Sequence, residues 1–183
     1  QKEGVLTTEF PWIPYSIINR FASDIWYGFH LLLIPFTAIP NEIIGIKVAG
    51  VFLTATLLML FSFALRRLGA PLFAFFIAPF FSAAPNVLSH FVMTRPHLLS
   101  TGLAALLFSL LFHGSVWGVF LASAGIAFFH LGLFWVVPLM VLCVMAGELM
   151  SGIPLNIRKS AAALLAFSPA GCSVQIRWAR SAL

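Results

Sequence analysis

Charged residues are scarce in this chain. Only 8% of its 183 residues are Asp, Glu, Lys or Arg and 61% are hydrophobic, whereas soluble domains carry about 25% charged residues. The two cysteines, Cys143 and Cys172, support neither a disulfide framework nor a thiolate metal cluster. The sequence also lacks a P-loop, a GxSxG elbow, an HExxH motif and a dinucleotide fingerprint. These absences argue against the easily recognised soluble enzymes, and the composition predicts an integral membrane protein.

The few charges that are present fall in small groups between apolar runs. A helix needs roughly 20 apolar residues to cross the hydrocarbon of a bilayer, and several of the runs are near that length. The groups lie at residues 2–9, 20–24, 42–47, 66–67, 95, 148, 158–159 and 177–180. The net charge of +5 is therefore spread over membrane edges rather than gathered into a patch, so no nucleic-acid partner is expected. We predict an all-α, polytopic transmembrane helical bundle surrounded by membrane lipids.

The chain divides into three predicted regions. Residues 1–42 are expected to form an extracytoplasmic loop with an amphipathic helix at the membrane interface. Residues 43–167 are expected to form about five spans and the start of another, beginning with spans at 43–65, 71–92 and 98–112. Residues 168–183 form a polar, basic tail that looks truncated or altered. Because the chain starts at Gln1 without a secretory leader, we interpret it as a fragment.

Residues 16–30 have the period of an amphipathic helix. Ile17, Phe21 and Phe29 share one face of such a helix, and Asp24 and His30 lie on the other. The apolar continuation after His30 is expected to end at the prolines that follow, because it is too short to cross a membrane.

The apolar stretch at residues 116–146 is too long for one upright membrane span and short for two. Cytoplasmic loops of membrane proteins are enriched in Lys and Arg. Two short helices that turn near residues 130–134 would place the basic pairs at 66–67 and 158–159 on the same, cytoplasmic side, whereas a single span would separate them. We therefore favour two helices, which places Asp24, Arg95 and His97 together on the other side.

Asp24 is the candidate general base. A carboxylate held at the membrane surface could accept a proton from a substrate or bind a polar group. The simpler interpretation is a pair with Arg20, which lies four residues earlier on the same helix face.

Arg95, His97 and His30 are the candidate substrate-binding residues. The guanidinium of Arg95 suits a phosphate group and is followed by Pro96, although it could equally extend to a lipid headgroup. His97 and His30 could assist binding or simply make hydrogen bonds at the interface. His90 and His130 are expected near the same membrane edge, but no histidine spacing matches a metal-ligand motif, so neither a metal nor a cofactor is predicted.

The order of these features resembles the N-terminal half of GT-C type integral membrane glycosyltransferases, in particular mannosyltransferases and arabinosyltransferases. The resemblance rests on Arg-Arg-Leu-Gly at 66–69, Arg-Pro-His-Leu-Leu-Ser at 95–100 and the apolar stretch at 125–138. It implies transfer of a sugar from a polyprenyl-phosphate donor at the non-cytoplasmic face of a multi-pass protein, which we expect in the bacterial inner membrane. It further implies that Asp24 is the base, with Glu9 as a weaker candidate, and that Arg95 and His97 lie near the donor phosphate. Asp24 departs from the family pattern in having no acidic neighbour.

Two other function classes remain open from the sequence. In a transporter or channel subunit, His90, Arg95 and His130 would line a pathway between helices. In a non-catalytic membrane assembly protein, Asp24 would only pair with Arg20. A pocket beside the amphipathic helix would favour the enzyme, and a through-going cavity would favour the transporter.

Overall fold

The computed structural model describes residues 26–70, 94–133 and 135–166. Within these ranges the regular structure is entirely helical, as predicted, with six α-helices and two 3-10 helices. They are α2 (Tyr27–Leu33), η1 (Ile34–Ala38), α3 (Glu42–Arg67), α6 (Pro96–His113), α7 (Val116–Phe129), η2 (Leu131–Leu133), α8 (Val136–Met150) and α9 (Ile157–Ala166). Two helices, α3 and α6, are long and apolar enough to cross a membrane. The expected span at 71–92 and the basic tail lie outside the described residues.

Helix α3 has clear start and stop signals. The side chain of Asn41 accepts hydrogen bonds from the backbone N–H groups of Ile43 and Ile44, at 3.1 and 3.2 Å. This satisfies two of the donors left unpaired at a helix start. The helix ends at Arg67, and Gly69 then takes a positive φ of 78° that glycine adopts without strain. The helix predicted at 43–65 is therefore confirmed and is slightly longer.

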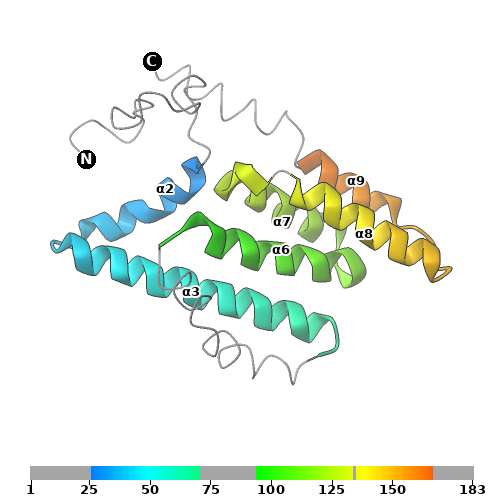
Figure 1. The fold of residues 1–183 in the computed structure, drawn as a ribbon, viewed down its shortest axis with the longest axis horizontal. Helices are drawn as coiled ribbons and strands as arrows, with labels where there is room; N and C mark the ends of the chain where they lie inside the picture. The colour runs from blue at the N-terminus through cyan, green and yellow to red at the C-terminus, as the bar shows by residue number, and fades with distance from the viewer. Residues whose placement is uncertain (1–25, 71–93, 134, 167–183) are drawn as a thin grey trace, which may run out of the picture.

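Helices α3 and α6 lie side by side and run in the same direction (Figure 1). At one end the Thr94 hydroxyl donates to the carbonyl of Ile46, and at the other the guanidinium of Arg67 donates to the carbonyl of His113. Midway, Gly102 lies against Leu57, where an added Cβ would be 3.3 Å from that residue's Cα. The first residues of α3 and α6 therefore lie at one end of the pair and their last residues at the other.

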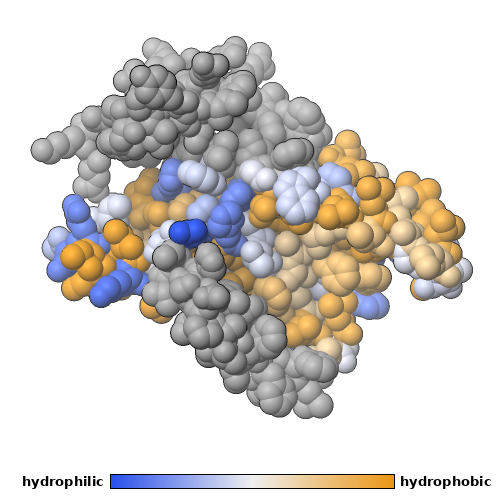
Figure 2. Space-filling view, viewed as in Figure 1, coloured by the Kyte–Doolittle hydropathy of each residue, from blue (hydrophilic) through white to orange (hydrophobic). Residues whose placement is uncertain are grey.

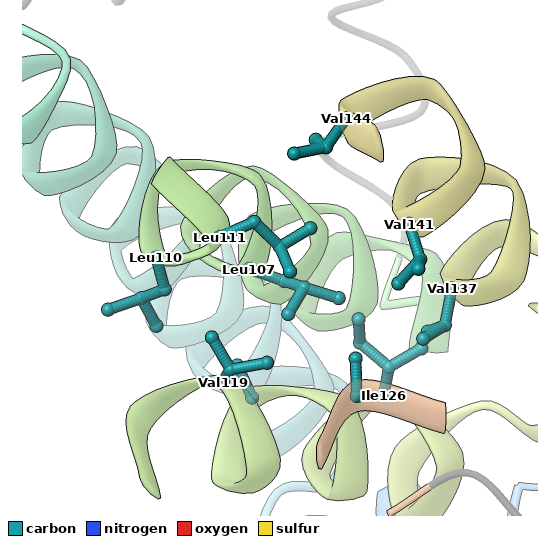
Figure 3. Packing of buried hydrophobic residues seen from close by; sticks show 10 residues of the cluster. Leu107, Leu110, Leu111, Val119, Ile126, Val137, Val141 and Val144 are labelled. Atoms are coloured by element: carbon teal, nitrogen blue, oxygen red, sulfur yellow. The ribbon is translucent and has the colours of Figure 1, made fainter. Parts of the chain in front are cut away.

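The main hydrophobic core lies between α6, α7, α8 and α9. Figure 3 shows leucines of α6 pointing toward valines of α8 and toward Val119 and Ile126 of α7. Helix α9 contributes small residues, of which Ala163 is fully buried. Small side chains let helix backbones approach closely, and α7 packs extensively against α9.

The stretch 116–146 contains two helices, as the charge argument predicted. Helix α7 ends at Phe129 and α8 begins at Val136, with the short helix η2 in between. Their lengths of 14 and 15 residues are below the roughly 20 residues of an upright span. Ser115 opens α7 by accepting a hydrogen bond from the N–H of Gly118 at 3.1 Å.

The segment after α2 ends at the prolines, as predicted, but contains one element that was not expected. Helix α2 ends at Leu33, and the chain continues as the 3-10 helix η1, which includes Pro35 in its first turn and ends at Ala38, before Pro40. Proline is tolerated at this position because the N–H that it lacks would have no helical partner there. Of the predicted amphipathic helix at 16–30, the structure describes only the part from Trp26 onward.

Large apolar side chains cover much of the exterior. On α3 alone, Ile43, Val51 and Met59 are each more than 60% exposed. Figure 2 shows hydrophobic residues over the side of the visible face where α8 and α9 lie. The interior, by contrast, contains the fully buried serines Ser100 and Ser109, whose hydroxyls donate to backbone carbonyls of α6.

Candidate functional site

One end of the bundle carries the two basic pairs, and we call it the basic end. Arg67 donates to the carbonyl of His113 at 2.6 Å, and the ammonium of Lys159 donates to the carbonyls of Leu111 and Phe112 at 3.2 Å each. These carbonyls belong to the C-terminal turn of α6, where the helix dipole favours positive charge. The tertiary fold thus brings residues 66–67 and 158–159 to the same end.

Glu148 also lies toward the basic end and is 9% exposed. Its carboxylate accepts a hydrogen bond from the backbone N–H of Asn156 at 3.2 Å. The contact connects the end of α8 to the start of α9. This hydrogen bond therefore has a structural role. Glu148 lies far from the predicted substrate-binding residues, which are at the other end of the bundle.

The opposite end contains a pair of histidines whose rings are in contact. His97 lies in the first turn of α6 and His130 caps the C-terminus of α7. Their ring centroids are 4.5 Å apart, with 35° between the ring planes. The indole of Trp26 meets His130 edge-on at 6.4 Å. We call Trp26, Arg95, His97 and His130 the histidine end.

His130 is the most enclosed member of the histidine end. It is 5% exposed, and neither ring nitrogen has a hydrogen-bond partner among the described residues. Burial lowers the pKa of His130 below its usual 6.5, and the nearby His97 lowers this pKa further because a second positive charge there would be repelled. His130 therefore favours the neutral form, in which one ring nitrogen is a donor and the other an acceptor.

Helix α2 covers the histidine end from one side. Phe29 is buried in a cluster with Leu98 and Leu99 of α6. Gly28 allows this approach, because an added Cβ would come within 2.5 Å of the carbonyl oxygen of Phe128. The apolar face of α2 thus anchors it where Trp26 reaches His130.

The structure brings three of the four predicted site residues toward this end. Arg95 is exposed at the N-cap of α6, His97 is exposed in the next turn, and His30 is exposed on α2 with its ring 6.1 Å from Phe29. Asp24, the predicted base, lies outside the described residues, as do Glu9 and His90. No group of three His, Cys, Asp or Glu side chains that could hold a metal ion occurs in the described ranges.

A partly open cavity of about 300 Å³ lies at the same end, between η1 and the start of α3. It is lined by Leu33, Phe36, Thr37, Glu42, Gly45, Ile46, Ala49 and Thr94. Thr37, Glu42 and Thr94 were not among the site residues predicted from the sequence. Only the position of Thr94, directly before Arg95, could have suggested one of them, since the cavity depends on how η1 folds back onto α3.

Comparisons of the chain with protein-family models, with curated proteins and with solved structures find no match.

Proposed function

We propose that this chain is part of a multi-pass membrane protein that binds a polyprenyl-phosphate-linked sugar at its histidine end, on the non-cytoplasmic face, and transfers the sugar. The observation that carries the proposal is that the two basic pairs lie at one end of the bundle and the candidate phosphate-binding residues at the other. Lys159 and Arg67 lie at one end, while Arg95, His97 and the cavity lie at the other. By the positive-inside tendency, the basic end is cytoplasmic.

The membrane location is supported by two features. Helices α3 and α6 are long and apolar enough to span a bilayer. The exposed apolar residues of α3 would contact lipid, while the small and polar residues Gly45, Ala49, Ser100 and Gly102 are buried inside the bundle. Interfaces between membrane helices are typically rich in such small residues.

The chemistry of the histidine end suits a lipid phosphate. The exposed guanidinium of Arg95 would bind the phosphate through paired hydrogen bonds. His97 lies in the first turn of the same helix and could donate to a phosphate oxygen while contacting His130. Asp24 stays the proposed general base on the basis of the sequence alone.

The packing favours a pocket over a transport pathway. The space between α6, α7 and α8 is filled by buried residues such as Leu107, Ile126 and Val137, each with 0% exposure. The cavity instead lies beside η1, at the outer edge of α3. Among the described residues, a pocket reached from one face therefore explains the arrangement better than a channel.

Donor binding by the full chain in liposomes would test the proposal. We expect radiolabelled polyprenyl-phosphate mannose to be retained by the wild-type chain, and Arg95→Gln to weaken retention about tenfold, because a charge-assisted hydrogen bond is lost. Arg158→Gln, which removes an exposed cation at the basic end, should leave retention unchanged. Absence of wild-type binding, or equal loss in both variants, would overturn the proposed site.

Thiol labelling would test the proposed orientation. In a background with Cys143→Ala and Cys172→Ala, single cysteines at Arg95 and Arg158 should react with an impermeant reagent from opposite sides of a sealed vesicle. Reaction of both from the same side would contradict the topology.

A further inference from the structure

We propose that the cavity between η1 and α3 binds the ammonium headgroup of an aminophospholipid such as phosphatidylethanolamine. Its walls combine an apolar floor with three polar groups. The floor includes Leu33, Phe36 and Ala49, and the polar groups are Thr37, Glu42 and Thr94. Such a site suits a ligand that has an apolar body and a small polar end.

The polar groups of the cavity act as hydrogen-bond acceptors. The hydroxyl of Thr37 donates its proton to the carbonyl of Ile34 at 2.7 Å, and the hydroxyl of Thr94 donates to the carbonyl of Ile46 at 3.1 Å. With their protons committed, the two hydroxyls offer only lone pairs. The ionised carboxylate of Glu42 is likewise an acceptor, and it carries negative charge. The complementary ligand group is a cation with several N–H donors, which describes a primary ammonium.

The next residue along the chain suits the other half of such a headgroup. Arg95 directly follows Thr94 and is exposed. In phosphatidylethanolamine the ammonium and the phosphate are joined by a two-carbon linker. A carboxylate in the cavity and an exposed arginine directly after the lining residue Thr94 match the two charges of this zwitterion.

The surroundings favour a lipid over a soluble amine. Ile46 contributes to the cavity wall and is 61% exposed, and Ile43 on the same helix is 66% exposed. Acyl chains could therefore continue along α3 from the cavity mouth. The inference rests on the membrane location proposed above. It does not require sugar transfer, although Arg95 is also the proposed ligand of the donor phosphate.

Close packing of η1 on α3 shapes the cavity. A Cβ added to Gly45 would lie 2.6 Å from the carbonyl oxygen of Phe36, which is far inside contact distance. Gly45→Ala should therefore shift η1 and weaken lipid retention even though no polar group of the cavity is changed.

Native mass spectrometry of the full chain in detergent would test the inference. The chain is incubated with equimolar dioleoyl phosphatidylethanolamine, phosphatidylcholine and phosphatidylglycerol, and the retained lipids are identified by mass. We expect phosphatidylethanolamine to be retained about tenfold more than phosphatidylcholine, since trimethylammonium has no N–H donors for Glu42. Equal retention of the two lipids, or a preference for phosphatidylglycerol, would overturn the inference.

Matched variants separate the cavity from general effects. Glu42→Gln should abolish the preference for phosphatidylethanolamine over phosphatidylcholine, and Glu42→Asp should keep part of it. Lys47→Gln, another charge change on the exposed surface of α3, should leave the preference unchanged. Thr37→Val should weaken retention, whereas Thr56→Val should not, because Thr56 makes the same type of hydroxyl bond, to the carbonyl of Phe52 at 2.9 Å, outside the cavity lining. A preference that survives Glu42→Gln would refute the assignment.

Three further measurements distinguish the possible outcomes. The unfolding midpoint of each variant in detergent shows that a loss of lipid is not a loss of fold. Soluble O-phosphoethanolamine should compete poorly, and competition as strong as that of the lipid would overturn the lipid assignment. Polyprenyl-phosphate mannose binding should survive Glu42→Gln, so failure of the proposed function and failure of this inference can be told apart.

Discussion

The imidazole rings of His97 and His130 lie 4.5 Å apart and join the start of α6 to the end of α7. The pKa of His130 is lowered from 6.5, first by burial and then by His97. The unfolded chain therefore binds a proton at His130 more readily than the folded chain does, so stability is highest above about pH 6.5 and falls as the pH decreases toward the folded pKa.

The thermal unfolding midpoint of the full chain in detergent, measured between pH 7.5 and 5.5, would check this dependence. His130→Gln should flatten the decrease below pH 6.5. His113→Gln removes an exposed histidine from the basic end and should leave the slope as in the wild type. An unchanged slope in His130→Gln would show that another group is responsible.

Lys159 stabilises the C-terminal turn of α6 through two carbonyl oxygens. Lys159→Gln removes the charge and shortens the reach, so we expect a loss of about 1 kcal/mol, which allows for the partial exposure of this side chain. Arg158→Gln is the matched control, since Arg158 is exposed. Chemical denaturation in mixed micelles would compare the two, and equal losses would argue against a specific cap.

Gly102 allows α3 and α6 to pack closely. A Cβ at this position would lie 2.9 Å from Cδ1 of Leu60 and 3.3 Å from the Cα of Leu57, so Gly102→Ala should destabilise the chain by about 1–3 kcal/mol through overpacking. Gly147 is also helical but has no atom within 4 Å of an added Cβ. Gly147→Ala should therefore be neutral or stabilising by up to about 1 kcal/mol. Unfolding measurements that show the same sign for both variants would contradict this packing.

Asn41 caps α3 through two backbone N–H groups. Asn41→Ala should cost about 1 kcal/mol, whereas Asn41→Asp should cost little, because Asp is an equally good cap. Helicity and thermal unfolding followed by circular dichroism would check the pair. An Asp variant as unstable as the Ala variant would mean that the cap bond contributes little.

Helix positions were largely predictable. The apolar runs at 43–65 and 98–112 correspond to α3 and α6 within two residues at each end, because charges and Pro96 mark their limits. The count of basic pairs predicted two helices in 116–146, and the structure contains α7 and α8 there. The apolar continuation after His30 ends where Pro35 and Pro40 predicted, since α2 ends at Leu33 and the 3-10 helix η1 ends at Ala38. The 3-10 helix itself was not predicted.

The candidate site was less predictable from the sequence than the helices were. His97 was selected as a site residue, but the contact between its ring and that of His130 depends on α7 returning along α6. Glu42 and Thr94 share a cavity only because α3 and α6 start at the same end of the bundle. No local sequence pattern predicts which residues on separate helices will be in contact.

The sequence by itself determined that the chain is helical, where the apolar helices begin and end, and which groups of charges lie at their ends, since these depend on composition and on breakers along the chain. The tertiary structure decided that α3 and α6 run in parallel, that the basic pairs lie around the end of α6, and that the ring of His97 contacts that of His130. The physical reason is that such helices are apolar on nearly every side, so hydrophobic periodicity does not mark their contact faces. Close packing at small residues such as Gly102 and Ala163 selects those faces instead.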